Sequence, residues 1–127
     1  PQRRRAWIAN FSLLMAAMFV AMALLRHAGA TVALMMVLGL LWGFNVLQYT
    51  DVRTSYPAAL TGRALSLYTM SMFLGAALMQ SATGSVAAWA TGFGIEPYRA
   101  VLLAIAAWVA LASLAFRFLP ASPLLRR

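Results

Sequence analysis

The stretch TSYPAALTGRALSLY, Thr54–Tyr68, separates two long apolar runs of the sequence and gathers a proline, a glycine and an arginine. An aspartate and a second arginine lie just before it. The residue that precedes a proline favours an extended backbone, so Pro57 predicts the end of a helix. Gly62 allows a tight turn before the next helix begins. The stretch therefore predicts a polar loop, 51–64, in an otherwise apolar chain.

The composition of the chain indicates a membrane protein. Hydrophobic residues make up 64% of the 127 residues and charged residues 9%, whereas a soluble domain carries about 25% charged residues. The mean hydropathy is +0.82. A chain of this length cannot bury so much apolar surface in one water-soluble core. The bilayer is therefore the predicted environment.

Four apolar runs surround the quoted stretch, and each has the roughly 20 residues that a helix needs to cross a bilayer. Every backbone polar group in lipid must be satisfied internally, which favours helices, and the alternating strands of a transmembrane barrel are not seen. The predicted fold class is all-α: a polytopic membrane protein with an antiparallel bundle of four transmembrane helices in a single membrane segment, 1–127. The runs are Ala6–Leu25, Thr31–Thr50, Leu65–Ala90 and Ala100–Leu119.

The first run and the first residue raise the question of processing. Ala6–Leu25 follows three arginines, as the apolar part of a secretory signal peptide does, but its 20 residues exceed the usual length of such a segment. We therefore interpret it as a transmembrane helix. The chain begins at Pro1 rather than at methionine, which suggests that it is part of a longer protein.

The distribution of arginine predicts the orientation. The net charge is +8, and all ten basic residues are arginine. Arg26 and Arg99 fall on one side of an up-and-down bundle, and the other eight fall on the opposite side: Arg3, Arg4, Arg5, Arg53, Arg63, Arg117, Arg126 and Arg127. Cytoplasmic loops carry the excess of arginine. The prediction is a multi-pass protein of the cell (inner) membrane with both termini and the middle loop in the cytoplasm.

Several classes of function are disfavoured by what the chain contains. The arginines flank apolar runs and do not form a basic groove with interleaved aromatic residues, so nucleic-acid binding is not predicted. The chain has no cysteine, one histidine (His27) and two acidic residues (Asp51 and Glu96), so we predict neither a metal site nor a cofactor. No nucleophile–base pair lies within a span, so an enzyme is not predicted. Proton coupling would need a carboxylate outside these residues.

Polar side chains within the spans are the candidate site. Trp42, Asn45 and Tyr49 share one face of the second run, with Gln48 beside it, and Gln80 lies near the middle of the third run. An unpaired amide in lipid is costly, so these amides should face protein or a watery cavity. Two interpretations stay open, namely hydrogen bonds between helices and contact with a substrate. The substrate-cavity candidates are Trp42, Asn45, Gln48 and Gln80.

Small and aromatic residues suggest how the helices pack. Gly39 and Gly43 have the spacing that lets two helix backbones approach closely, and Gly75 and Gly84 lie in the third run. Trp108 in the fourth run is interpreted as a packing or lipid-facing aromatic residue.

Two further residues receive structural interpretations. Tyr68 fits an interfacial aromatic belt near the end of a span. Ser113 is nearly the only polar residue of its helix, so it is interpreted as structural.

The segment YPAALTGRALSLYTMSMFLGAALMQSATG, Tyr56–Gly84, resembles the connection between helices 10 and 11 of major facilitator superfamily transporters. The matching features are Pro57, then Gly62-Arg63-Ala64, then a helix with Gly75, Gln80 and the Thr83-Gly84 pair. The arginine triplet resembles the loop between helices 8 and 9 of that family. The resemblance implies that the four runs are helices 9 to 12 and that the C-terminus is cytoplasmic.

This resemblance implies a C-terminal part of a secondary active transporter of small molecules that works by alternating access. Its partners would be the bilayer and the remaining helices of the same transporter. The second and third runs would border the substrate path, with Asp51, Arg53 and Arg63 at a cytoplasmic gate. The absence of charge in those runs mildly favours an uncharged or amphipathic substrate.

An alternative is a free-standing four-helix membrane subunit or assembly protein without transport activity, which would use GLLWG, 39–43, to bind a partner. The two interpretations differ over Asn45 and Gln80. A transporter needs these amides in a water-accessible cavity, and a subunit needs them at a dry helix interface.

Overall fold

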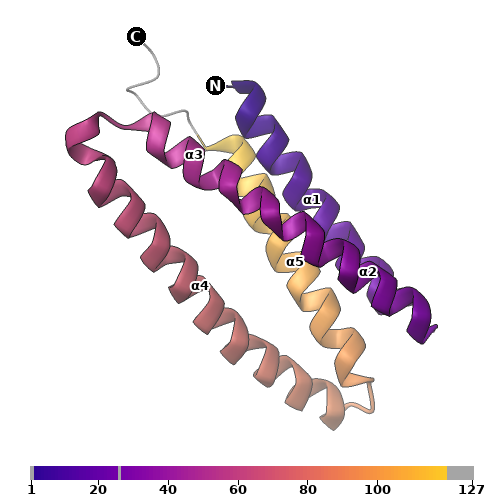
Figure 1. Cartoon of the computed structure of the whole chain (residues 1–127). Coiled ribbons are helices and arrows are strands. Elements are labelled where there is room, and N and C mark those ends of the chain that lie inside the picture. The colour runs from indigo at the N-terminus through magenta and orange to yellow at the C-terminus, as the bar shows by residue number, and fades with distance from the viewer. Residues whose placement is uncertain (1, 26, 120–127) are drawn as a thin grey trace.

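The computed structural model describes residues 2–25 and 27–119, with side chains from residue 5 onward. Every regular element in this part of the chain is a helix, which confirms the predicted all-α class. The elements are α1 (Gln2–Leu24), α2 (Ala28–Leu41), η1 (Trp42–Phe44), α3 (Asn45–Ser55), α4 (Ala58–Gly92) and α5 (Pro97–Phe118). Figure 1 shows them as a bundle of long rods.

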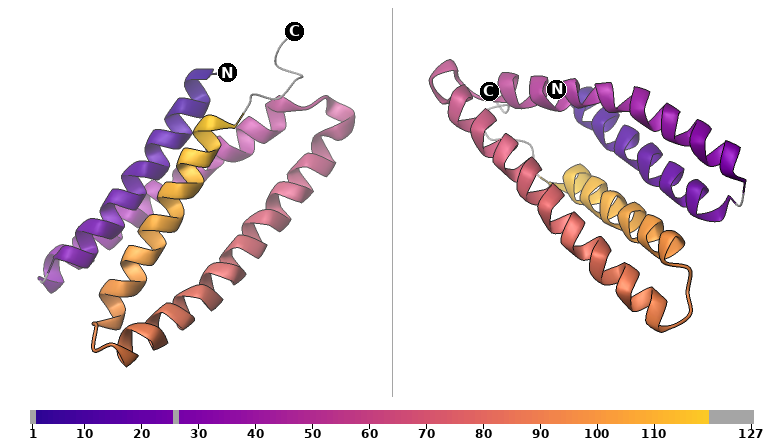
Figure 2. Two further views of the ribbon diagram at one scale, coloured as in Figure 1. Left: turned by 180° about the vertical axis from the view of Figure 1, so that it is seen from behind. Right: turned by 60° about the horizontal axis from the view of Figure 1, so that its bottom comes forward.

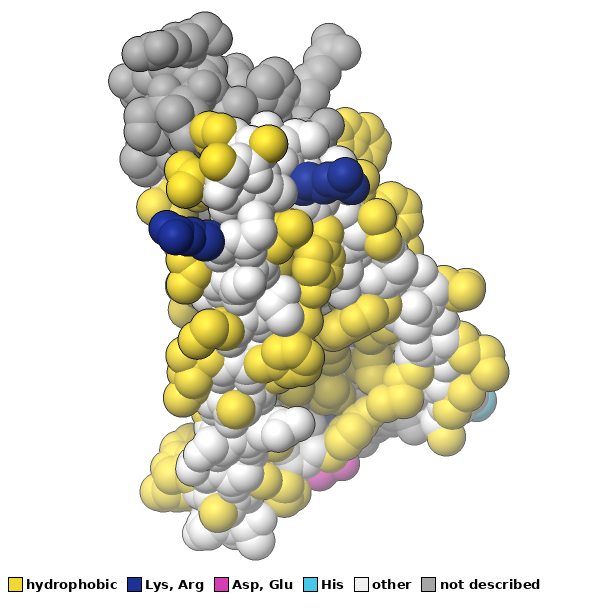
Figure 3. Space-filling view, turned by 60° about the vertical axis from the view of Figure 1, so that its left-hand side comes forward, with side chains coloured by type: hydrophobic (Ala, Val, Ile, Leu, Met, Phe, Trp, Pro, Cys, Tyr) yellow, Lys and Arg dark blue, Asp and Glu magenta, His cyan; other side chains and the backbone are white. Residues whose placement is uncertain are grey.

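Three helical segments are long and apolar enough to cross a membrane, namely Arg5–Leu24, Ala28–Ser55 and Pro97–Phe118. The chain is therefore a helical membrane protein. Figure 3 shows that the visible face is covered largely by hydrophobic and uncharged side chains, with charged groups at few points. The long helix α4, which contains the third predicted run, is not among the three, because serine, threonine, glutamine and glycine interrupt its apolar residues.

The second predicted run is one helical path with a short change of pitch. α2 continues through the 3₁₀ turn Trp42–Phe44 into α3 without leaving helical backbone angles. Tight 3₁₀ turns within a helix often mark a local change of direction or a functional hinge. The path is 28 residues long, Ala28–Ser55, so it extends beyond the predicted end at Thr50.

The prediction of a loop over residues 51–64 is wrong for most of that range. Residues 51–55 complete α3 and residues 58–64 begin α4, so the connection is only Tyr56 and Pro57. Ser55 donates a hydrogen bond of 2.6 Å from Oγ to the Asp51 carbonyl, a local bond that is compatible with helix. Gly62 lies inside α4 and makes no turn, because a single helical glycine costs only about 1 kcal/mol relative to alanine.

The break itself occurs where the proline predicts it. Tyr56 has the extended angles φ −128° and ψ 150°, as expected for a residue whose helical conformation would clash with the following proline ring. Pro57 then begins the next element as the N-cap of α4. The other predicted bounds differ from the observed ones by a few residues at most ends: 6–25 against 2–24, 65–90 against 58–92, and 100–119 against 97–118.

The turn between α4 and α5 depends on one glycine. Gly94 has φ +68°, a conformation that side chains with a β-carbon rarely adopt. The Ile95 N–H bonds to the Ala90 carbonyl at 2.9 Å, and the Gly94 N–H bonds to the Thr91 carbonyl at 3.1 Å. This pair of bonds is the Schellman arrangement that closes a helix C-terminus. Pro97 then opens α5 at its first turn, where no amide donor is needed.

The helices α1 and α5 form the closest pair in the described chain. Ala9, Ala16 and Ala23, seven residues apart, are buried along α1 and allow close approach. They are matched on α5 by a second row of buried residues, Leu102, Ala106 and Ser113.

Two arginines fix the direction of this pair. Arg5, near the start of α1, donates from Nη2 to the carbonyls of Phe116 (3.3 Å) and Leu119 (3.2 Å). Arg99, near the start of α5, donates from Nε to the Ala23 carbonyl at 2.8 Å. Each arginine therefore satisfies carbonyls at the C-terminal end of the other helix, where the last turn lacks internal donors. The two helices run in opposite directions, as Figure 1 and both views of Figure 2 show.

The remaining helices lie around this pair. A cluster of Met18, Met22, Leu38 and Leu102 joins α1, α2 and α5. α4 lies beside α5 and contacts α3 near the Tyr56–Pro57 break. Arg26, Arg126 and Arg127, and the side chains of Arg3 and Arg4, which all entered the orientation argument, lie outside the described residues.

Candidate functional site

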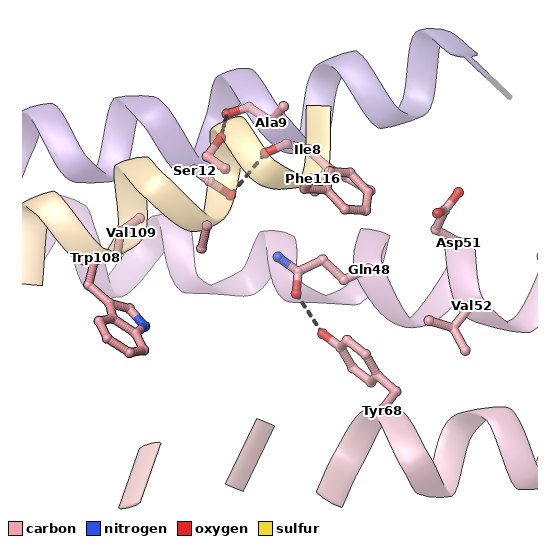
Figure 4. Close-up of a pocket in the computed structure, with 12 residues that line it drawn as sticks. Ile8, Ala9, Ser12, Gln48, Asp51, Val52, Tyr68, Trp108, Val109 and Phe116 are labelled. Carbon is pink, nitrogen blue, oxygen red and sulfur yellow. Dashed lines mark hydrogen bonds between the residues drawn. The ribbon is translucent and has the colours of Figure 1, made fainter. Parts of the chain in front are cut away.

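A cavity of about 430 Å³ lies between α1, α3, α4 and α5, and it is the candidate site. Its wall is mostly apolar, with a few polar groups that point inward (Figure 4). Sites for small molecules commonly have this character and a volume of this order. The lining residues are Ile8, Ala9, Ser12, Gln48, Asp51, Val52, Tyr68, Trp108, Val109, Ala112, Ser113 and Phe116.

The polar centre of the cavity is an amide–phenol pair that joins α3 to α4. The Tyr68 hydroxyl donates a hydrogen bond of 2.5 Å to Oε1 of Gln48. The Tyr68 ring also packs edge-on against Tyr49, with the two ring centroids 4.9 Å apart and the planes at 79°. These contacts hold the phenol in place. Figure 4 shows the amide nitrogen of Gln48 on the side away from Tyr68.

That amide nitrogen is available to a ligand. Within the described residues, no hydrogen bond from the Gln48 side-chain nitrogen is formed, and no buried side-chain nitrogen or oxygen atom lacks a partner. The nitrogen is therefore not fully buried, and its two N–H groups are free donors on a residue that lines the cavity. Trp108 adds an indole N–H, and its ring reaches from α5 towards α4 (Figure 4).

The two serines of the cavity are tied to the backbone. Ser12 donates from Oγ to the Ile8 carbonyl at 3.0 Å, and Ser113 donates to the Ala9 carbonyl at 2.8 Å. Their single protons are therefore used, and only the lone pairs of the two oxygens remain as acceptors. The second bond also joins α5 to α1 in a buried position.

Charge is nearly balanced around the cavity. Asp51 is the one charged residue among the described lining residues, and it already takes part in an interaction of its own. Arg5 does not line the cavity, but its guanidinium carbon lies 4.9 Å from the ring centroid of Phe116, which does. Among the residues whose side chains the structure describes, one negative and one positive group therefore lie at or near the site.

Only two of the four sequence-predicted cavity residues come together. Gln48 lines the cavity of about 430 Å³, which Asn45 does not reach. Both Asn45 and Gln48 border a gap of about 20 Å³ beside Phe11 and Phe44. The exposed fraction of Trp42 is 64%. Gln80 is exposed on α4, where its backbone carbonyl accepts a hydrogen bond of 2.9 Å from Thr83 Oγ1.

The three predicted gate residues also separate. Asp51 lines the main cavity, whereas Arg53 is exposed at the end of α3. Arg63 borders a shallower groove of about 400 Å³ between α3 and α4, together with Tyr56 and Tyr68. Tyr68 therefore forms part of the wall of both hollows.

The predicted packing glycines have no neighbour within the described chain. A β-carbon built at Gly39, Gly43, Gly75 or Gly84 would meet no atom within 4 Å. Packing of these glycines against helices outside the chain stays a prediction.

Sequence reasoning missed the roles of Tyr68 and Trp108. Tyr68 was interpreted as an interfacial aromatic residue and Trp108 as packing or lipid-facing. Both also line the cavity, while the 52% exposed fraction of Trp108 agrees with a lipid-facing surface. A signal for the second was present, because Trp108, Ala112 and Phe116 recur at intervals of four on one face of α5. No local signal pairs Tyr68 with Gln48, because that contact depends on how α3 and α4 are aligned.

No protein-family model matches this chain, and no curated protein or solved structure shows significant similarity to it. Among the described residues, no three histidine, aspartate or glutamate side chains gather into a group that could hold a metal ion.

Proposed function

We propose that the chain is the C-terminal part of a secondary active transporter of the major facilitator superfamily, with α1, α2–α3, α4 and α5 as its helices 9 to 12. In this proposal the cavity between the helices is part of the path of a small molecule. The observation that carries the proposal is the Gln48–Tyr68 pair, which presents a free amide to a cavity of about 430 Å³ between otherwise apolar helices.

The directions of the helices support four crossings rather than three. α1 and α5 run in opposite directions, because Arg5 bonds to Leu119 and Arg99 bonds to Ala23. If α4 stayed on one side of the membrane, α5 would start where α3 ends and would run in the same direction as α1. The observed direction of α5 therefore favours a membrane crossing by α4 and an antiparallel bundle. Its 35 residues extend over about 50 Å, more than a hydrocarbon core needs.

The polar residues of α4 are compatible with a place in the membrane. The hydroxyls of Ser66, Ser71 and Thr91 donate to the carbonyls four residues earlier, at 3.0, 2.8 and 2.9 Å. A hydroxyl that is bonded to its own helix costs less in lipid than a free one. The remaining polarity, above all Gln80, favours contact with further protein or with a watery path.

The packing also agrees with the roles that the family resemblance implies. The resemblance assigns α1 and α5 to outer supporting helices, and these two form the most closely packed pair. It assigns α3 and α4 to the border of the path, and these carry Gln48 and Tyr68. One feature departs from the expectation, since eight of the twelve residues that line the cavity belong to α1 and α5.

The experiment that tests the proposal measures access to Gln48 from both sides of the membrane. The sequence has no cysteine, so Gln48→Cys in the full gene product, with any thiol outside this segment replaced, gives one target for an impermeant thiol reagent. Alternating access predicts that right-side-out and inside-out vesicles both react. The matched control is Ala106→Cys, because Ala106 lies between α1 and α5 with an exposed fraction of only 3%. Its thiol should react in neither kind of vesicle. A thiol of Gln48→Cys that reacts in neither kind of vesicle would refute the proposal.

The alternative of a membrane subunit without transport has one observation in its favour. Asn45 lies in a nearly filled gap against Phe11 and Phe44, as expected at a dry helix interface. The alternative predicts that Asn45→Cys, Gln48→Cys and Gln80→Cys are all protected from the reagent by a bound partner.

A further inference from the structure

We propose that the cavity selects an uncharged, amphipathic molecule that carries a hydrogen-bond acceptor next to a flat apolar body. This inference rests on the proposed function and deepens it by naming the class of substrate. Three features of the cavity lead to it: the unused donors, the aromatic walls and the balance of charge.

The hydrogen-bond donors that remain unused in the cavity belong to Gln48 and Trp108. The protons of Ser12, Ser113 and Tyr68 are already given to protein oxygens. The amide N–H groups of Gln48 and the indole N–H of Trp108 are left to meet a ligand. A carbonyl, ether or hydroxyl oxygen on the ligand would satisfy them. A ligand without such an oxygen would leave these donors unpaired, and that is the basis of selection against purely apolar molecules.

The aromatic walls favour a flat body. Figure 4 shows the rings of Tyr68 and Trp108 on two sides of the space beside Gln48. Tyr68 is held by its hydrogen bond and by the edge contact with Tyr49, so it offers a wall that is ordered before a ligand binds. Flat apolar groups stack well between such rings.

The charges near the cavity disfavour both ions. A cation would be attracted by Asp51 but repelled by Arg5, whose guanidinium carbon lies 4.9 Å from the centroid of the Phe116 ring. An anion would be attracted by Arg5 and repelled by Asp51. For either ion, attraction by one charged group opposes repulsion by the other. The remaining contribution is the cost of losing its hydration, which an apolar wall does not replace. An uncharged molecule avoids that cost.

The test compares three probes of one shape, benzamide (uncharged), benzamidinium (positive) and benzoate (negative). The full gene product is placed in lipid nanodiscs with a single thiol at Ala112→Cys, which lines the cavity, and each probe is scored by how far it slows labelling with a maleimide. The control thiol is Ala115→Cys, exposed on the same helix but outside the cavity. We expect benzamide to protect Cys at position 112 at concentrations at least roughly tenfold lower than either ion, with no protection at position 115.

Two variants connect the result to the amide. Gln48→Leu should raise the benzamide concentration needed by roughly fivefold, because a neutral hydrogen bond is lost. Gln48→Glu keeps the acceptor for Tyr68 but adds a negative charge, and it should shift the preference from benzamide to benzamidinium.

The outcomes separate this inference from the proposed function. Stronger protection by benzamidinium or benzoate in the unmodified cavity, or a reactive thiol that no probe protects, would overturn the inference and leave an accessible cavity. A thiol at position 112 that never reacts would overturn both.

Discussion

The hydroxyl of Ser113 donates a hydrogen bond of 2.8 Å to the backbone carbonyl of Ala9, and both residues are almost completely buried. This bond crosses the closest helix pair of the molecule, α1 with α5. It explains how a polar side chain can lie in an apolar interface, because its proton has a partner. The same interface has an arginine bond at each end, from Arg5 and from Arg99.

Substitution of Ser113 should show that size matters more than the bond. Ser113→Ala removes one hydrogen bond between helices and should lower stability by about 0.6 kcal/mol, the average for such bonds in a membrane protein. Ser113→Leu inserts a large side chain where Ala9 is exposed to only 1% and should cost about 1–3 kcal/mol. Unfolding by titration with a denaturing detergent measures both. Equal losses in the two variants would contradict the close packing.

Tyr68→Phe should weaken the connection between α3 and α4 while leaving the ring contact with Tyr49 in place. The expected loss is about 0.5–1.5 kcal/mol for the bond to Gln48. A double-mutant cycle with Gln48→Leu tests whether the loss belongs to this pair. If it does, the stability lost in the double variant should be smaller than the sum of the two single losses. Strictly additive losses would mean that the two side chains do not interact.

The two arginine bonds should depend on the shape of the guanidinium as well as on its charge. Arg5→Lys keeps the charge but replaces a planar guanidinium whose Nη2 reaches two carbonyls, so we expect a loss of about 1 kcal/mol. Arg99→Gln should cost a similar amount. The matched control is Arg53→Lys, because Arg53 is exposed. Thermal unfolding in detergent measures the three, and a control loss as large as that of Arg5→Lys would refute the argument.

The α4–α5 turn should tolerate alanine at one glycine and not at its neighbour. Gly94→Ala forces a β-carbon into φ +68° and should destabilise by about 1 kcal/mol. Gly92 lies at the helical end of α4, and a β-carbon built there would meet no atom of another segment within 4 Å. Gly92→Ala should therefore be neutral or stabilise the protein by up to about 1 kcal/mol. The difference between the two melting temperatures is the measurement. Identical shifts would rule out a conformational role for Gly94.

The proposed membrane crossing by α4 predicts that its two ends face opposite sides. Tyr56 and Phe93 flank α4 and are both exposed. A thiol at Tyr56→Cys should react with an impermeant reagent only from the cytoplasmic side, and one at Phe93→Cys only from the outer side. Reaction of both from one side would exclude the four-helix topology.

The class of the protein follows from its amino-acid composition and its long apolar runs. Its low content of charge and its long apolar runs leave helices in a bilayer as the physical solution, and the structure confirms an all-helical chain with three segments apolar enough to cross a membrane. The break at Pro57 was also readable, because the steric restriction on Tyr56 is local.

The sequence misled where two local tendencies competed. The polar stretch 51–64 reads as a loop from its composition, but its helical turns are completed by backbone bonds and by hydroxyl bonds such as that of Ser55. A lone glycine such as Gly62 is too weak a signal to end a helix.

Which polar groups form a site depends on how the helices pack. Asn45, Gln48 and Gln80 look alike in the sequence, yet Asn45 borders only a small gap, Gln48 also lines the cavity of about 430 Å³, and Gln80 is exposed. The physical reason is that a side chain's surroundings depend on the rotation and alignment of whole helices. Those are set by contacts between residues far apart in the chain, such as Ser113 with Ala9 and Tyr68 with Gln48.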